Sequence, residues 1–307
     1  MTVGPRFSRR DALRALALPA LPVWPRLGQA QARTPIIRTI PASGEALPAV
    51  GVGSWITFNV PPDTAAAGAL VPVLSAFFER GGTMIDSSPM YGYSESVIGR
   101  MLGQVPHPRL FSATKIWTLG KTLGRMQFER SLELWRVPRF DLVHIHNLLD
   151  WETHLPTLKE LKAAGRARYI GVTTSEGNKH DEMERALKRE RFDFVQFTYN
   201  LADRRVEDRL LPLAAERGAA VVINRPFDGG ALFRTVREKA LPPWAAEFDC
   251  ENWAQFFLKF ILSHPAVTCA IPATRQRPHM LENMGALYGR LPDAQARRRM
   301  AQTWEML

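Results

Sequence analysis

Four side chains in the first half of the sequence are of types that move protons. Asp86 ends a short apolar run, Tyr91 follows five residues later, Lys115 lies in FSATKIW, and His146 ends DLVHIH. A phenol with its ordinary pKa of about 10 is a weak acid at neutral pH, but a nearby ammonium makes its proton easier to release. Asp86 would hold Lys115 charged, and His146 could polarise a carbonyl through its oxygen. The set predicts a proton donor that works with a separate source of electrons.

Short apolar runs typical of strands alternate with helix-like runs from Ile36 onward. After a hairpin at 36–47, strands are expected at 50–55, 83–87, 110–116, 140–146, 168–174, 192–198, 219–224 and 267–271. Helices are expected at 64–80, 94–102, 127–135, 154–164, 181–188, 206–217, 253–263 and 278–287. Eight such pairs with short crossovers predict a single-domain (β/α)₈ TIM barrel, whose reactive groups gather at the C-terminal strand ends. Asp86, Lys115 and His146 lie at three adjacent ends.

An open, doubly wound sheet is the alternative architecture. Its Gly-rich phosphate loop would have to be Gly51-Val52-Gly53, which lacks the third glycine of a dinucleotide fingerprint. The closed barrel is therefore favoured.

The order and context of the four residues resemble the catalytic tetrad of the aldo-keto reductase family. The segments IDSSPMYGYSESVIG and DLVHIH carry the resemblance, which extends from Val50 to Asn283. It implies an NADP-dependent oxidoreductase that reduces an aldehyde or ketone. Tyr91 would be the general acid assisted by Lys115 and Asp86, His146 would orient the carbonyl, and NADPH would deliver hydride.

The resemblance also implies residues around the nicotinamide, with departures. Thr173 and Thr174 of GVTTSEG stand where a serine and an asparagine bind the carboxamide, and Gln196 of FVQF matches the family's glutamine at that amide. A threonine hydroxyl can replace serine, but it cannot reproduce both halves of an amide. Asn224 stands where an aromatic ring usually stacks on the nicotinamide, and Arg225 where serine is common. The nicotinamide must therefore be held differently.

The segment IPATRQRPHMLEN resembles the family's site for the adenosine 2′-phosphate and adenine. Thr274, Arg275 and His279 would contact the phosphate, and Glu282 and Asn283 the adenine. Because a guanidinium recognises phosphate well, this segment favours NADP over NAD.

The first 32 residues have the form of a cleavable export signal, and 33–307 would be the barrel. A basic head, a short apolar stretch and the small-residue site Ala30-Gln31-Ala32 follow one another in order. Ser8-Arg9-Arg10 resembles a twin-arginine signal, although Ala12 replaces the usual bulky residue. We therefore expect export of the folded protein to the periplasm by the twin-arginine machinery, or a cytoplasmic location if the signal is not used.

Composition argues against several other classes. The net charge is +10, yet basic and acidic residues are mixed and no basic run is interleaved with stacking aromatics, so nucleic-acid binding is not expected. No apolar run reaches the roughly 18 residues of a membrane span. Cys250 and Cys269 are the only cysteines; they could form one disulfide, but ordinary buried thiols are favoured. No metal is expected from their spacing.

Two functional alternatives and the substrate stay open. His144 and His146 point to one face of a strand and could bind zinc in a barrel hydrolase. A non-catalytic barrel could bind NADP as a sensor or partner subunit. The walls of the substrate site are expected from apolar residues of the strand-end loops, namely Trp55, Trp117, Trp151 and Phe227.

Overall fold

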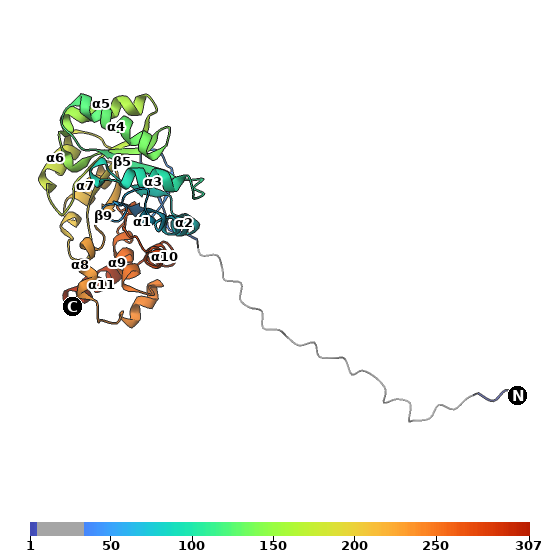
Figure 1. Ribbon diagram of the computed structural model, residues 1–307. Coiled ribbons are helices and arrows are strands. Elements are labelled where there is room, and N and C mark those ends of the chain that lie inside the picture. Colours follow the sequence, from blue (N-terminus) through green and yellow to red (C-terminus); the bar gives the residue numbers. More distant parts are fainter. Residues whose placement is uncertain (5–33) are drawn as a thin grey trace. The chain divides into compact units, whose positions relative to one another are not determined.

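The structure is a computed structural model that describes residues 1–4 and 34–307 (Figure 1). Most of the expected export signal, including its arginine pair and cleavage site, lies outside the described residues. Thr34–Leu307 form one compact unit. None of the described helices has the length and apolar composition that a membrane crossing needs.

The central sheet is a parallel barrel whose strands follow chain order. Its last and first strands are joined by a parallel bridge between Val50 and Ala270, where Gly51 N–H donates to the Ala270 carbonyl at 2.9 Å. This bridge closes the barrel and confirms the (β/α)₈ prediction. The strands are β3 (Val52–Gly53), β4 (Met84–Asp86), β5 (Phe111–Ile116), β6 (Phe140–Ile145), β7 (Ala167–Thr173), β8 (Phe194–Thr198), β9 (Ala220–Asn224) and β10 (Cys269–Ala270).

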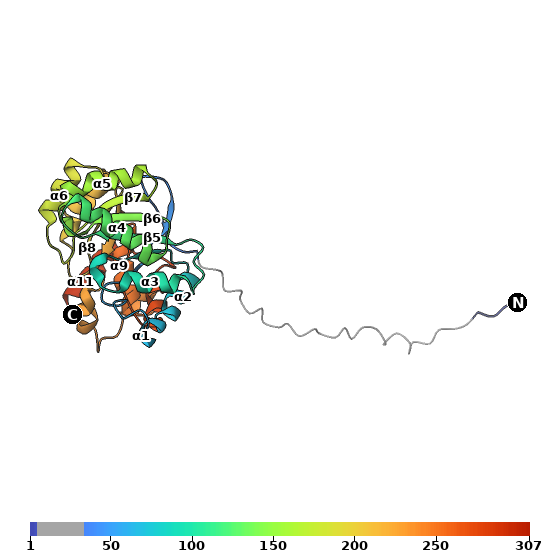
Figure 2. The same cartoon turned by 45° about the horizontal axis from the view of Figure 1, so that its top comes forward.

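The helices surround these strands, as Figures 1 and 2 show. The eight expected helical regions contain α2 (Val71–Glu79), α3 (Ser94–Leu102), α4 (Lys121–Trp135), α5 (Trp151–Ala163), α6 (His180–Arg189), α7 (Leu210–Glu216), α9 (Trp253–Leu262) and α10 (Arg277–Gly285). The helix expected at 64–80 is divided, because α1 (Ala65–Gly68) ends before Leu70 and Pro72 lies in the first turn of α2. Proline is favoured there, since its missing N–H has no partner in that turn. Two helices, α8 (Ala231–Thr235) and α11 (Ala294–Glu305), were not predicted.

Strand alternation decides which side chains fill the barrel. Phe111, Leu142, Tyr169 and Phe194 form the interior core, together with Ile40 and Leu47 next to and within the hairpin of β1 (Ile37–Thr39) and β2 (Ala46–Pro48). Because side chains on one face recur every second residue, Phe111 places Lys115 on the interior face, and Leu142 places His146 there. The apolar layer fills the N-terminal part of the barrel, and the polar groups therefore lie toward its C-terminal mouth.

Candidate active site

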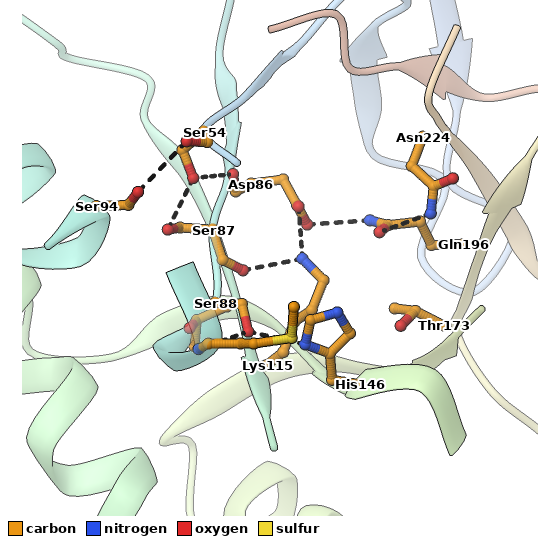
Figure 3. Close-up of polar contacts among 12 residues, drawn as sticks. Ser54, Asp86, Ser87, Ser88, Ser94, Lys115, His146, Thr173, Gln196 and Asn224 are labelled. Atoms are coloured by element: carbon orange, nitrogen blue, oxygen red, sulfur yellow. Dashed lines mark hydrogen bonds and ion pairs between the residues drawn. The ribbon is translucent and has the colours of Figure 1, made fainter. Parts of the chain in front are cut away.

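A buried ion pair joins two neighbouring strands at this mouth. Lys115 Nζ on β5 lies 2.5 Å from Asp86 Oδ2 on β4 and donates to the Ser87 carbonyl at 2.9 Å (Figure 3). The side chains are 0% and 3% exposed. Burial lowers the pKa of Lys115, and the Asp86 and Glu95 carboxylates oppose that shift. The bond to the Ser87 carbonyl is one of the additional hydrogen bonds that a buried charge pair needs to offset its loss of hydration.

The second oxygen of Asp86 is held from β8. Gln196 Nε2 donates to Asp86 Oδ1 at 3.0 Å, and Gln196 Oε1 lies 3.4 Å from Asn224 Nδ2 (Figure 3). The resemblance implied Gln196 only as a ligand of the nicotinamide amide. In the structure its nitrogen orients Asp86, which leaves its oxygen as the atom available to a bound amide.

His146 is the first residue of the short helix η3 (His146–Leu148) that follows β6. Ser88 Oγ lies 2.9 Å from its Nδ1 and accepts the Met90 N–H at 3.3 Å, so the serine hydroxyl is free to donate to Nδ1. The imidazole then carries its hydrogen on Nε2, where it can donate to a carbonyl oxygen. Burial, and secondarily the charge of Lys115, lower the pKa of His146 to about 3. It is therefore a neutral hydrogen-bond donor.

Tyr91 ends the short helix η2 (Pro89–Tyr91) after β4. Gly92 follows with a φ of 58°, and a Cβ there would lie 2.3 Å from Asn59 Oδ1, so only glycine fits this turn. The Tyr91 ring meets His146 edge to face at 5.6 Å, and Lys115 Nζ lies 5.4 Å from the ring centre. Burial, and then the charge of Asp86, raise the pKa of Tyr91. Lys115 is not among the groups that shift this pKa, because Asp86 already pairs with that ammonium, and its assistance to Tyr91 stays a prediction.

One cavity of about 640 Å³ contains most of the predicted site. Its lining includes Asp86, Tyr91, His146, Thr173, Thr174, Gln196, Asn224 and Arg225, with Trp55 and Phe227 among its apolar walls. The prediction for Trp151 is wrong: its side chain is buried against Phe192 and is not in the cavity lining. Trp117 is half exposed outside the cavity lining.

The residues predicted around the nicotinamide form a hydrogen-bonded wall. Asn224 Nδ2 donates to the Thr174 carbonyl at 2.8 Å, and its Oδ1 accepts from Thr198 Oγ1 at 2.8 Å. Thr173 Oγ1 accepts the Asn147 N–H at 2.9 Å. Asn224 therefore replaces a stacking ring by an amide that belongs to the same network as Gln196 and Asp86.

The five residues predicted for the adenosine half are not in the cavity lining but follow its last residues in the chain. Ile271 and Ala273 line the cavity, whereas Thr274 is buried and accepts the Gln276 N–H at 3.1 Å. Arg275 precedes α10 and His279 lies in its first turn, and both are exposed. Farther along this helix, Glu282 is half-buried and Asn283 is buried.

Two polar residues of the site were missed by sequence reasoning. Ser88, which holds His146, was given no role in the sequence analysis. Glu95 was placed only within the helix expected at 94–102, yet it is buried and accepts from Thr114 Oγ1 at 2.6 Å, Ser131 Oγ at 3.0 Å and Trp135 Nε1 at 3.0 Å. Burial raises the pKa of Glu95 against these bonds. It ties α3, the helix after Tyr91, to the strand that bears Lys115.

The described part of the chain holds no set of ligands for the zinc site considered above. No three His, Cys, Asp or Glu side chains come together there in a way that could hold a metal ion. His144 is buried inside the barrel, one layer below His146, and neither ring nitrogen has a protein partner. Cys250 and Cys269 are both buried, free thiols.

Comparison with known proteins identifies the architecture. The profile of the Aldo/keto reductase family matches residues 49–301. This chain belongs to that family. Membership of this family makes the chain an NAD(P)H-dependent oxidoreductase.

Individual relatives are distant. A probable aldo-keto reductase 1 from Glycine max is 24% identical over 74% of this chain and 77% of its own length. An NADH-specific methylglyoxal reductase from Escherichia coli is 26% identical over 53% of this chain and 57% of its own length, so this chain spans little more than half of that relative. The crystal structure of a Klebsiella pneumoniae aldo-keto reductase in complex with NADPH is 23% identical, with a TM-score of 0.73 over 88% of this chain and 95% of that one.

Proposed function

We propose that this protein reduces an aldehyde or ketone with NADPH and that Tyr91 is the general acid. The observation that carries the proposal is the convergence of a neutral phenol, a neutral imidazole with its hydrogen on Nε2, and a buried Lys115–Asp86 pair at one cavity. Such a set can bind a carbonyl oxygen and give it a proton, but it cannot supply electrons. When bound, NADPH supplies the hydride.

Each side chain has a separate task in this reaction. His146 Nε2 donates a hydrogen bond to the carbonyl oxygen and so favours negative charge on it. As that charge develops, Tyr91 passes its phenolic proton to the same oxygen, and the alcohol results. Lys115 then faces a transient phenolate, whose charge the ammonium stabilises until water in the open cavity restores the proton.

The cavity offers unfilled polar atoms to a nicotinamide cofactor. Asn147 Oδ1 and Arg225 Nε are buried without a hydrogen-bond partner, and the Thr173 side chain lies in the same lining. Thr173, Gln196 and Asn224 would hold the nicotinamide half, while Thr274, Arg275, His279, Glu282 and Asn283 would hold the adenosine half. The exposed guanidinium of Arg275 favours NADPH, the cofactor named for the Klebsiella structure. If NADH were turned over as well as NADPH, the proposed role of Arg275 would be wrong.

The decisive experiment compares two tyrosines two residues apart. NADPH absorbance is followed with a panel of aldehydes and ketones for the wild type, Tyr91→Phe and Tyr93→Phe. Loss of a general acid should lower kcat by a factor of roughly 10² or more. Tyr93 is 53% exposed and outside the cavity lining, so its variant should keep full activity. Equal activity of both variants would rule Tyr91 out as the acid.

We also propose that the chain is exported to the periplasm through the twin-arginine pathway. The motif Ser8-Arg9-Arg10 and the Ala30-Gln31-Ala32 cleavage site support this. Replacing both arginines by lysine preserves charge and should abolish export. The full chain and this variant are compared by cell fractionation, and a wild type found only in the cytoplasm would refute the proposal.

A further inference from the structure

Arg225 is held rigidly at the mouth of the cavity. It follows β9 directly and has a φ of 48°, a left-handed conformation that is unfavourable for a side chain of this size. Its carbonyl accepts from Asn200 Nδ2 at 3.0 Å, which fixes this backbone. The guanidinium carbon lies 5.9 Å from the ring centre of Trp55, a residue of the loop after β3. Backbone and stacking together aim the charge into the cavity that Arg225 lines.

The guanidinium is poorly bonded in this position. Its two ion pairs, to Glu176 Oε1 and Asp228 Oδ1, are each 3.3 Å long, whereas charge-assisted bonds are typically about 2.7–2.9 Å. Arg225 Nε is buried and has no hydrogen-bond partner. By contrast, Arg205 meets Asp203 with two bonds of 2.8 Å. Arg225 therefore retains donors for another acceptor.

The neighbouring residues leave room for such an acceptor. Gly229 also lines the cavity, and a Cβ at this position would lie 3.4 Å from Arg225 Nη2. The side chain of Glu176 is 57% exposed, and an exposed ion pair contributes about 0–1 kcal/mol. Exchanging Glu176 for a better-placed anion therefore costs little.

We propose that Arg225 binds an anionic oxygen group of a molecule in the cavity and that Glu176 is the counter-ion which this group displaces. The inference rests on the proposed function in taking the cavity as the cofactor and substrate site. A planar guanidinium offers a two-pronged donor to phosphate or carboxylate alike. The group is thus either a phosphate of the cofactor or a carboxylate on the carbonyl substrate.

Calorimetric titration tests this without turnover. The probes are NADPH, NADH, 4-carboxybenzaldehyde and the uncharged 4-methylbenzaldehyde, each with the wild type, Arg225→Gln, Glu176→Gln and Arg189→Gln. Arg189 is a matched control, because it also stacks on a tryptophan (Trp151, 5.3 Å) and pairs with a glutamate (Glu152, 2.5 Å), but outside the cavity lining. Losing a bond to a charged group should weaken the recognised anion by a factor of roughly 10 or more in Arg225→Gln. Glu176→Gln should make the binding of the same anion tighter at low salt.

The pattern of losses identifies the anion. Equal weakening of NADPH and NADH assigns Arg225 to the diphosphate, weakening of NADPH alone to the 2′-phosphate, and weakening of 4-carboxybenzaldehyde alone to a substrate carboxylate. The proposal is overturned if the wild type binds none of the probes, if Arg225→Gln matches Arg189→Gln for all of them, or if Glu176→Gln weakens the same anion. Anion binding through Arg225 in a protein that never oxidises NADPH would refute the reductase and leave this inference standing.

Discussion

The two sides of the cavity are bonded in different ways. On the side of β4, β5 and β6, Lys115 meets Asp86 at 2.5 Å and Ser88 meets His146 at 2.9 Å, all within buried surroundings. On the side of the loops after β7 and β9, the ion pairs of Arg225 are 3.3 Å long and a buried donor lacks a partner. The bonds that orient the first side are in place without a bound molecule, whereas the second side has a buried donor without a partner.

The difference follows from what each side must do. Proton transfer requires fixed geometry and fixed charge, which closely bonded buried groups supply before anything binds. Recognition of a departing cofactor requires contacts that form and break, which half-exposed groups on loops allow. The comparison predicts that changes on the first side affect folding and kcat, whereas changes on the second side affect binding.

The largest effect is expected from Lys115→Met. Removing one partner leaves Asp86 charged and buried, which should lower the free energy of unfolding by about 3–5 kcal/mol. Adding Asp86→Leu should restore much of that stability, although both proteins would be inactive. Urea denaturation measures the free energy of unfolding of each variant.

Lys188→Met is the matched control for this prediction. Lys188 pairs with Glu184 at 2.7 Å, but its side chain is 63% exposed. Loss of such a helix-surface pair should cost about 0.5 kcal/mol or less. Equal costs for the two lysine variants would show that the buried side is not the rigid one.

Lowering the pH is expected to have an intermediate effect on the free energy of unfolding. Burial and the charge of Lys115 lower the pKa of His146 to about 3, so the unfolded chain takes up a proton below about 6.5 that the folded protein excludes. The contribution of the neutral histidine is complete above pH 6.5 and is lost as the pH falls toward 3. In that window this contribution to the free energy of unfolding changes by about 1.4 kcal/mol per pH unit.

Urea unfolding between pH 4 and 8 tests this for the wild type and His146→Gln. The variant should lack the added slope, and His279→Gln, at an exposed position on α10, should retain it. Parallel stability curves for the wild type and His146→Gln would contradict the assignment of a buried neutral imidazole.

The sequence predicts the first side better than the second. Strand alternation and the common direction of parallel strands suffice to bring Asp86, Lys115 and His146 to one mouth. The role of Ser88 was not predicted, because a hydroxyl in a turn usually bonds within the turn itself and its partner His146 is 58 residues away in the sequence. The two residues come together only when the barrel has formed.

Features that depend on polar contacts between distant residues were not predicted, and α11 is one of them. In α11 only Met300 is buried. Ala301 and Trp304 pack against the core only partly buried, and Arg297 adds bonds to Tyr199 at 2.6 Å and to Glu207 at 2.7 Å. The apolar stripe of this helix is therefore short and easily missed in the sequence. Gln196 shows the same limit: its type was informative, but its bond to Asp86 depends on two strands that are not adjacent in the sheet.

The smallest effect separates the two sides most directly. Asn224→Ala removes the bonds to the Thr174 carbonyl and Thr198 Oγ1, and water in the open cavity can replace them. The free energy of unfolding should fall by about 1 kcal/mol, and the KM for NADPH should rise a few-fold while kcat changes less than about twofold. Ser88→Ala is the matching loss on the first side and should instead lower kcat by a factor of roughly 3–10, because His146 loses its orientation. If Asn224→Ala lowered kcat and Ser88→Ala raised only KM, the division between a fixed side and an exchanging side would have to be abandoned.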